Sequence, residues 1–372
     1  MDRGILFFIT SFAASFVLFP ATIKVLRKYN LLDTPGGRKI HTEHTPSIGG
    51  VPIFLGIMLS IVMWLPLAYI GEFKYVISAL IISFVLGLRD DLIDLKANQK
   101  LLGQIAAASL LIFFCDIRLR SMYGLFGIYD IPIWASFLIT TFTFIVVTNA
   151  LNLIDGIDGL AASVGIICLL FFGGWFMLVG KVHFSFFCFA FAGSLLAFLN
   201  YNWAPSKIFM GDTGSLLIGF FIAASTIYFI DTNYKLPADS LFKFNAFVGT
   251  GVGVIIIPLY DTLRVFIKRV LSGKSPMTPD KNHVHHVLLK LGMNHAGATT
   301  TLILVNLLFV SLIVICRDLT DMVVLPSVIG LSITLGVMLD FLYRGKVKDK
   351  RKDQDDDEPE TEAKQIYFPK SA

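Results

Sequence analysis

Long apolar stretches separated by short polar segments repeat along almost the whole chain. Eleven of them are candidate membrane-spanning helices: residues 4–23, 48–70, 73–88, 101–115, 131–151, 159–180, 182–199, 213–230, 246–263, 298–316 and 322–343. A helix of about 20 apolar residues crosses the ~30 Å hydrocarbon core of a bilayer. The pattern therefore predicts an all-α fold, a polytopic membrane helical bundle with about eleven transmembrane helices.

The positions of Lys and Arg predict which ends of these helices face the cytoplasm. If the N-terminus lies outside, the inside segments hold about three times as many Lys and Arg residues as the outside ones. Leaving out one span would place the basic segments 24–47 and 344–372 on opposite sides. We therefore expect a multi-pass protein of the cytoplasmic (inner) membrane, with the N-terminus outside and the C-terminus in the cytoplasm.

The composition supports a membrane protein and excludes several other classes. Hydrophobic residues make up 55% of the 372 residues and charged residues 16%, whereas a soluble globular domain has roughly 45–50% and 25%. These values exclude a soluble cytoplasmic enzyme, a disordered chain and a secreted disulfide scaffold. The four cysteines stand singly in the sequence, so we expect them to act as small buried hydrophobic residues. A net charge of +4 is too small to indicate a nucleic-acid partner.

The chain changes character after Tyr343. Residues 346–364 are almost wholly charged or polar and cannot form a hydrophobic core. We therefore expect an integral membrane domain at 1–343, which carries the chemistry. A charged, disordered cytoplasmic tail is expected at 344–372.

Ionisable and amide side chains gather at the predicted inner ends of the helices. Placing such groups in or beside a membrane costs free energy, which makes them candidates for function. The first group is Asp90 and Asp91, which follow the stretch 73–88, with Lys100 opening the next stretch. Two adjacent carboxylates repel each other, and a cation or a proton between them relieves that repulsion. This group indicates a metal-phosphate site or a general base, and a solvated helix end is the alternative.

The second group lies within residues 149–159. Asn149 and Asn152 are one helical turn apart, so both amides can face the same side. Asp155 and Asp158 each precede a glycine, which ends the helix and lets a ligand approach the backbone closely. An ordinary turn explains the glycines, but it does not explain this set of acids and amides at a membrane surface.

The third group precedes the stretch 213–230 and contains Asn202, Phe209 and Asp212. Asp212 is either the N-cap of the following helix or a Mg²⁺ carboxylate beside helix N-terminal amides that can receive phosphate oxygens. The ring of Phe209 offers a face for a nucleobase to stack on.

The fourth group is His283, His285 and His286, in a basic segment. Zinc is one interpretation of this spacing, but no cysteine partner lies on the inside and the nearby acids suit a hard cation. We therefore expect the histidines to hold anionic phosphate. Lys39 and His41, in another basic and glycine-bearing segment on the same face, can supply further cations.

Carboxylates, amides and cations at an inner membrane surface are typical of phosphoryl transfer. A metal ion and basic side chains neutralise the transferring group, while an acid activates the nucleophile. One substrate can arrive from the cytosol and the other from the lipid. A transporter or channel is the alternative from another class, because intramembrane acids also mark ion pathways. Here, however, the acids lie at one end of the spans instead of near the midplane.

Four motifs in this order resemble those of the polyprenyl-phosphate N-acetylhexosamine-1-phosphate transferases: DDLIDL, NALNLIDGIDGL, FMGDTGS and DKNHVHHVLLKLG. The resemblance covers roughly residues 5–340. The last motif looks like that of the branch using UDP-N-acetylglucosamine. The branch that makes the first lipid of peptidoglycan has three consecutive histidines, whereas Val284 separates His283 from His285 here.

The resemblance implies that a polyprenyl phosphate attacks the β-phosphate of a UDP-sugar, releasing UMP and leaving a lipid-linked pyrophosphoryl sugar. It also implies Mg²⁺, or Mn²⁺ in its place, as the cofactor. By motif position, the implied site residues are Asp212 and Asn152 for the metal, Asp90 and Asp91 for catalysis, Lys100, His283, His285 and His286 for phosphates or the sugar, and Asp158, Asn202 and Phe209 for uridine, with Asp155 nearby.

The expected partners are thus a UDP-N-acetylhexosamine, a polyprenyl lipid such as undecaprenyl phosphate, and the bilayer. The motifs favour UDP-N-acetylglucosamine but leave open another UDP-N-acetylhexosamine or UDP-N-acetylmuramoyl-pentapeptide. They also leave open which glycan the product feeds: O-antigen, common antigen or teichoic acid. A homodimer is compatible with a bundle of this kind.

Overall fold

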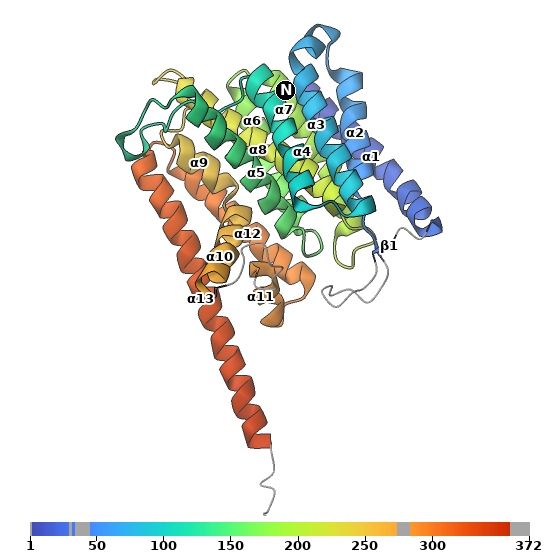
Figure 1. Ribbon diagram of the computed structural model, residues 1–372, viewed down its shortest axis with the longest axis vertical. Helices are drawn as coiled ribbons and strands as arrows, with labels where there is room; N and C mark the ends of the chain where they lie inside the picture. Colours follow the sequence, from blue (N-terminus) through green and yellow to red (C-terminus); the bar gives the residue numbers. More distant parts are fainter. Residues whose placement is uncertain (1, 30–31, 34–44, 274–282, 358–372) are drawn as a thin grey trace, which may run out of the picture.

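The computed structural model describes residues 2–29, 32–33, 45–273 and 283–357, and nearly all of its regular structure is helical (Figure 1). The helices are α1 (Asp2–Lys28), α2 (Gly50–Trp64), α3 (Leu67–Ile93), α4 (Ala97–Phe114), α5 (Ile133–Ile154), α6 (Leu160–Leu178), α7 (Val182–Asn202), α8 (Gly211–Lys235), α9 (Phe247–Val254), α10 (Ile256–Leu271), α11 (Val284–Lys290), α12 (His295–Ile315) and α13 (Asp321–Asp357), with a 3₁₀ turn η1 at Leu125–Gly127. Two short strands, β1 (Leu32–Asp33) and β2 (Thr45–Pro46), pair antiparallel. The all-α prediction is confirmed.

Every predicted apolar stretch contains helix, and the described residues hold several helices suited to a bilayer. Seven helices in these ranges are long and apolar enough to span a membrane, or up to eight if the bent pair α9–α10 is one span. The seven are α1, α5, α6, α7, α8, α12 and α13. A multi-pass membrane protein is therefore supported, as the hydropathy pattern predicts.

Two predicted spans are interrupted by proline. The stretch 48–70 is not one helix, because α2 ends at Trp64 and Pro66 (φ −61°, ψ 139°) begins the next helix, α3. The stretch 246–263 breaks at Ile255, where α9 and α10 meet at an angle of 81°. Pro258 has no N–H for the carbonyl of Val254, so the helical ladder stops there.

The carbonyl that Pro258 leaves free is satisfied by other helices. Oxygen of Val254 accepts from Sγ of Cys168 and from Nδ2 of Asn306, each at 3.3 Å. Helices α6 and α12 thus hold the break from two sides, as buried backbone at membrane depth requires. The bend is therefore a built feature of the bundle, and it turns α10 towards the end where the polar groups gather (Figure 1).

The C-terminal segment differs in part from the sequence expectation. Although 344–372 was expected to be disordered, α13 continues as helix to Asp357 and projects beyond the bundle (Figure 1). Residues 358–372 lie outside the described residues. Helix propagation explains the extension, because each further residue adds a hydrogen bond to an existing nucleus even where the side chains are charged.

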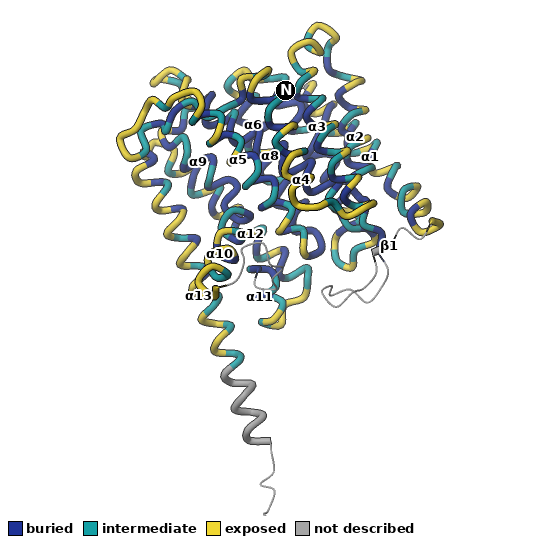
Figure 2. The backbone as a smooth tube through the Cα atoms, in the orientation of Figure 1, coloured by how far each residue is buried: buried dark blue, intermediate teal, exposed yellow. Residues whose placement is uncertain are grey.

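Helix α8 forms the centre of the bundle. Of its most apolar 18 residues, 94% are buried inside the protein, and Figure 2 shows it lying among the dark blue, buried segments. Helices α3, α5 and α6 pack around it. Asp212 lies in the first turn of this central helix. The polar residues before α8 must reach the surface, so Asp212 lies where the ends of several helices meet.

Candidate active site

The predicted site residues meet at one end of the bundle. The C-terminal ends of α3, α5 and α7 lie there with the N-terminal ends of α4, α6, α8 and α12, and α11 lies at the same end (Figure 1). Antiparallel packing of successive helices produces this convergence. Segments that are far apart in the sequence thus form one polar surface.

The centre of this surface is a cation between two carboxylates. Nζ of Lys100, in the first turn of α4, lies 2.5 Å from Oδ2 of Asp90 and 3.1 Å from Oδ2 of Asp212. The other oxygen of Asp90 accepts from the backbone N–H of Leu95 at 2.8 Å. Three helices therefore converge on one ion cluster, in which the ammonium group offsets the repulsion between the acids.

Asn152, which the motif pairs with Asp212, is its direct neighbour. Nδ2 of Asn152 donates to Oδ1 of Asp212 and also, at 2.8 Å, to Oγ of Ser215. The hydroxyl of Ser215 in turn donates to the carbonyl of Gly211 at 3.0 Å. The two residues implied for the metal are thus brought together by α5 and α8.

Asp91 caps helix α8 from a distant part of the chain. Its Oδ1 accepts from the backbone N–H of Asp212 at 2.7 Å, and its Oδ2 accepts from the backbone N–H and hydroxyl of Thr213 at 2.9 and 2.5 Å. The first N–H groups of a helix have no hydrogen-bond acceptor within the helix, and the Asp91 carboxylate is the acceptor here. The alternative of Asp212 as the N-cap is therefore wrong: Asp91 caps α8, which leaves the Asp212 side chain directed to Lys100 and Asn152.

Gly211 makes this close junction possible. Its φ is +71°, and a Cβ at this position would lie 1.9 Å from the carbonyl oxygen of Ser47 and 2.5 Å from Oδ2 of Asp91. Nearby, the segment after β2 is fixed by hydrogen bonds from the N–H groups of Gly49 and Gly50 to the carbonyls of Phe209 and Met210 at 2.9 and 3.0 Å. The loop before α8, which carries Phe209, is therefore held against β2.

Asp155 lies beside this centre, on the turn after α5. Burial raises the pKa of its carboxyl well above the usual range, and the negative charges of Asp212, Asp91 and Asp158 raise it further. The side chain accepts no hydrogen bond from the described residues that would offset this effect. A cation or a proton at this position would therefore be strongly favoured.

Asp158 and Asn202 are buried and bind mainly backbone. Oδ1 of Asn202 accepts from the N–H of Gly159 at 2.8 Å, and its Nδ2 donates to the carbonyl of Ile208 at 2.9 Å. Oδ2 of Asp158 accepts from the N–H of Ser206 at 3.3 Å. These contacts tie together the loops around the site, whereas the predicted contact with uridine stays a prediction.

His285, in α11, packs against the same turn, and His283 and His286 lie beside it in the sequence. Nδ1 of His283 lies 2.7 Å from Oδ2 of Asp261 in α10, whose Oδ1 accepts from the N–H of Val284 at 2.7 Å. The ring of His285 packs against Gly156, since a Cβ there would lie 2.5 Å from Nε2. Burial lowers the pKa of His285 to about 3, so its imidazole is neutral at physiological pH. The ring of His286 lies 4.3 Å from that of His285.

Two residues of this cluster belong to none of the four groups that the sequence predicts. Asp261 anchors His283, and Nδ1 of His295, at the start of α12, lies 3.6 Å from Oδ2 of Asp158. An acid inside the apolar stretch 246–263 was a signal that could have identified Asp261. Lys39 and His41 lie outside the described residues.

Comparisons with known proteins identify the family of the chain. The sequence model described as "Glycosyl transferase family 4" matches residues 73–230, which include Asp90, Lys100, Asn152 and Asp212. A Bacillus subtilis (strain 168) protein named "Probable undecaprenyl-phosphate N-acetylglucosaminyl 1-phosphate transferase" is 30% identical, over 83% of this chain and 84% of its own. The chain belongs to glycosyl transferase family 4.

Further relatives carry related names. The Mycolicibacterium smegmatis (strain ATCC 700084 / mc(2)155) "Decaprenyl-phosphate N-acetylglucosaminephosphotransferase" is 33% identical, over 77% of this chain and 76% of its own. The Escherichia coli (strain K12) "Undecaprenyl-phosphate alpha-N-acetylglucosaminyl 1-phosphate transferase" is 28% identical, over 78% and 77%. The resemblance to the polyprenyl-phosphate N-acetylhexosamine-1-phosphate transferases is thereby confirmed.

The oxygen atoms of this family 4 site suit a hard cation. Asp90, Asp212 and Asn152 offer carboxylate and amide groups, and the Lys100 ammonium already marks a position for positive charge between the two acids. In the described ranges, no three His, Cys, Asp or Glu side chains are grouped to hold a metal ion by themselves. Mg²⁺ is usually held by one or two carboxylates together with substrate phosphates, so this donor set fits it.

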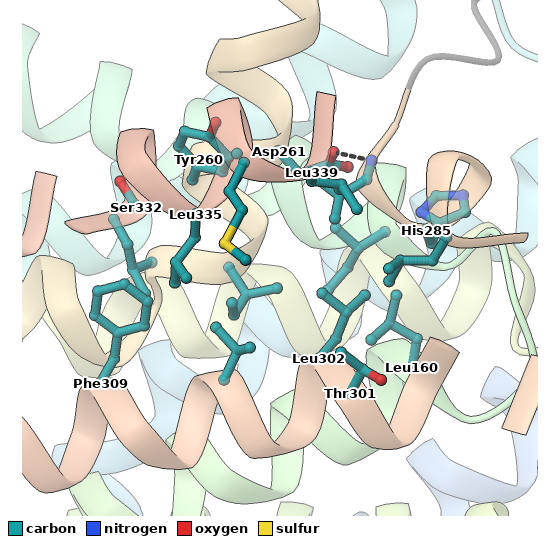
Figure 3. A pocket seen from close by; sticks show the side chains of 18 of the residues that line it. Leu160, Tyr260, Asp261, His285, Thr301, Leu302, Phe309, Ser332, Leu335 and Leu339 are labelled. Atoms are coloured by element: carbon teal, nitrogen blue, oxygen red, sulfur yellow. Dashed lines mark hydrogen bonds between the residues drawn. The ribbon is translucent and has the colours of Figure 1, made fainter. Parts of the chain in front are cut away.

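An apolar cavity of about 280 Å³ lies beside His285. It lies between α10, α11, α12 and α13, and Figure 3 shows Asp261 and His285 towards one end and Phe309 and Ser332 towards the other. Leucines 302, 335 and 339 line the wall between them. Asp261 and His285 thus lie at one end of an apolar space within the bundle.

Proposed function

We propose that this protein transfers N-acetylglucosamine 1-phosphate from UDP-N-acetylglucosamine to undecaprenyl phosphate and releases UMP. The observation that carries the proposal is the convergence of Asp90, Lys100 and Asp212 from three helices, beside the histidines of α11. Family membership and the names of the relatives support the same chemistry. The lipid-linked product would begin a cell-envelope glycan.

In the reaction, an oxygen of the lipid phosphate attacks the β-phosphorus of the UDP-sugar. A bond forms between them, the bond from the β-phosphorus to the bridging oxygen of UMP breaks, and UMP leaves. Lys100 can bind an oxygen of either phosphate, because its side chain is partly exposed. Its Nζ lies between the two carboxylates of the central cluster, where the phosphates would meet. Asp90 can position the lipid phosphate through Lys100 or accept its proton.

Mg²⁺, or Mn²⁺, would be held by Asp212 and Asn152 together with substrate phosphates. When bound, it would neutralise the charge that develops on the transferring phosphoryl group and on the leaving UMP. Asp91 acts on this site through α8, since it fixes the backbone of Asp212 and Thr213. In this proposal Asp91 is a positioning residue.

The neighbouring loops would receive the UDP-sugar. The neutral ring of His285 cannot pair with phosphate as a cation, but it can donate or accept a hydrogen bond towards the pyrophosphate or sugar. His283 is anchored by Asp261. Phe209, on the loop held against β2, would stack on the base, and Asp158 and Asn202 shape the uridine side.

The apolar cavity beside His285 would hold isoprene units of the lipid. Its wall is built from leucines of α12 and α13, and it opens next to the polar groups that would meet the phosphate (Figure 3). An apolar pocket with a few polar groups at one end is the usual form of a site for an amphipathic ligand.

For the topology, we propose eleven spans with the N-terminus outside and the active site at the cytoplasmic face of the inner membrane. The Lys and Arg distribution supports this orientation. The helices α2, α3 and α4 and the bent pair α9–α10 would complete the seven spans identified by length and hydropathy in the described residues.

The decisive experiment is UMP release by the purified protein with undecaprenyl phosphate and Mg²⁺. UDP-N-acetylglucosamine is compared with UDP-N-acetylmuramoyl-pentapeptide, and reactions without lipid or with a chelator serve as controls. Release with the first nucleotide alone is expected. Release with only the second would retain the chemistry and overturn the sugar assignment. The absence of release with either nucleotide, or with other UDP-N-acetylhexosamines, would contradict the proposed function.

A further inference from the structure

The last helix is clamped to the helix that anchors the histidines. Asp340 of α13 pairs with Nη2 of Arg264 and, at 2.6 Å, with Nζ of Lys268, both on α10. The Arg264 side chain is only 5% exposed, so its charge is poorly solvated by water. Removing the carboxylate would take away a counter-charge that lies in direct contact with this buried cation, which is a costly change.

Helix α11 is held at both ends by the helices that this clamp joins. At its N-terminal end, Asp261 of α10 binds His283 and the N–H of Val284, each at 2.7 Å. At its C-terminal end, Nζ of Lys346 on α13 donates to the carbonyl of Leu291 at 2.5 Å. Because α11 has only seven residues, it cannot hold its orientation by its own hydrogen bonds.

A second contact strengthens the C-terminal attachment. Nζ of Lys290 lies 5.7 Å from the centre of the Tyr343 ring, within the range of a cation–π interaction. Helices α10, α11 and α13 therefore form a closed ring of polar contacts around one end of the apolar cavity. These contacts among the three helices hold His285 against Gly156, on the turn that carries Asp155.

We propose that Asp340 and Lys346 are positioning residues of the active site, which act by fixing α11 and its histidines against the turn at 155–159. Neither residue touches the central cluster of Asp90, Lys100 and Asp212. Their effect passes through Arg264 and Asp261 at one end of α11 and through Leu291 at the other. The expected effect on turnover rests on the proposed function, whereas the attachment of α11 does not.

The test compares Asp340→Asn and Lys346→Met with a matched control at the opposite end of the bundle. Asp231 is likewise a carboxylate between two cations, Arg120 at 3.1 Å and Lys235 at 2.6 Å, and its side chain is more buried than that of Asp340, so Asp231→Asn makes the same chemical change far from α11 at an equally demanding position. Hydrogen–deuterium exchange of the α11 amides and the kcat for UMP release are measured for each purified variant.

In both α13 variants, we expect exchange in α11 to rise about tenfold and kcat to fall about tenfold, since small misplacements of a site cost that much or more. In Asp231→Asn, Tm falls, but α11 exchange and kcat stay within about twofold of the wild type. Asp340→Glu, which keeps the carboxylate, should recover most of the loss. If Asp340→Asn does not fold, Lys346→Met, which changes a partly exposed residue, decides.

Two results would overturn the proposal: unchanged α11 exchange in Lys346→Met, or a kcat loss equal to that of Asp231→Asn. A wild-type protein that releases no UMP would count against the proposed function alone. The exchange data would still decide whether α13 fixes α11, because they need no substrate.

Discussion

Asp212 gains its chemical setting from three other residues, each from a different helix. Lys100 lies 3.1 Å from one of its oxygens, Asn152 donates to the other, and Asp91 binds its backbone N–H. Lys100 thus offsets the charge of Asp212, Asn152 orients its carboxylate, and Asp91 fixes its backbone. A substitution at Asp212 should therefore remove chemistry without removing the packing of α8, which depends on its buried apolar face.

Replacing Asp212 by Ala should reduce UMP release by about 10²–10³-fold, because a preorganised charged group at a reacting phosphate contributes that much. Asp239→Ala is the control, since Asp239 is an exposed acid in the loop after α8. Initial rates are measured at saturating Mg²⁺, with size-exclusion profiles to verify folding. Wild-type activity in Asp212→Ala would contradict the assigned role.

His285 makes the stability of the protein sensitive to acid. Its pKa is about 3 in the folded protein and about 6.5 in an unfolded chain. Between these values only the unfolded chain binds the proton, so the free energy of unfolding contributed by this residue decreases as the pH falls from 6.5 towards 3. The loss of Tm between pH 7 and pH 5 should be smaller in His285→Gln than in the wild type. Equal losses in the two proteins would refute this explanation.

At the scale of helices and turns, the start of α8 is the most constrained junction of the site. Gly211 has a positive φ, and atoms of Ser47 and Asp91 occupy the space that a Cβ would need. The bend between α9 and α10 is constrained in another way, through the Val254 carbonyl that Cys168 and Asn306 satisfy. The first junction lies at the polar end of the bundle, whereas the second lies at the depth of the middle of α6 and α12, which hold Cys168 and Asn306.

Gly211→Ala should lower stability by about 1–3 kcal/mol through backbone strain and clash, and it should reduce turnover because Asp91 can no longer cap α8. Gly174→Ala is the matched control: Gly174 lies inside α6 with no neighbouring atoms within 4 Å of a Cβ. That change should stabilise the helix by up to about 1 kcal/mol. Thermal unfolding and UMP release are measured for both, and equal Tm values would contradict the argument.

At the scale of the whole molecule, the polar site and the loops after α4 and α8 lie at opposite ends of the bundle (Figure 1). The far end carries its own ion network, in which Asp231 binds Arg120 and Lys235. Figure 2 shows that much of α13 is exposed. Its exposed residues include large hydrophobic side chains such as Val337, Met338 and Phe341, which suits contact with lipid. These features fit a protein that presents one catalytic face to one side of a membrane.

The orientation predicts opposite labelling of two single cysteines in a background with the four native cysteines replaced by Ala. Asp239→Cys should react with a membrane-impermeant maleimide in intact cells, because the proposed topology places that loop outside. Gly345→Cys, on α13, should react only after permeabilisation. The cysteine-free protein is the control. Labelling of both positions from the same side would exclude the eleven-span topology.

The sequence by itself determined the helical class, the apolar stretches and the polar motifs at their ends, because hydropathy and residue type act locally. It could not place the breaks at Pro66 and Ile255 correctly, since both lie within continuous apolar runs. It paired Asp212 with Asn152 only through a resemblance, which the contact between them supports.

Tertiary structure alone decided which groups meet. Asp91 caps a helix that begins 120 residues later, with the Asp212 N–H 121 positions away in the sequence, and Asp261 anchors a histidine 22 positions away. No local pattern encodes such contacts, because they depend on how the helices pack. The sequence therefore supplied the chemical groups, and the packing around α8 set the distances between them.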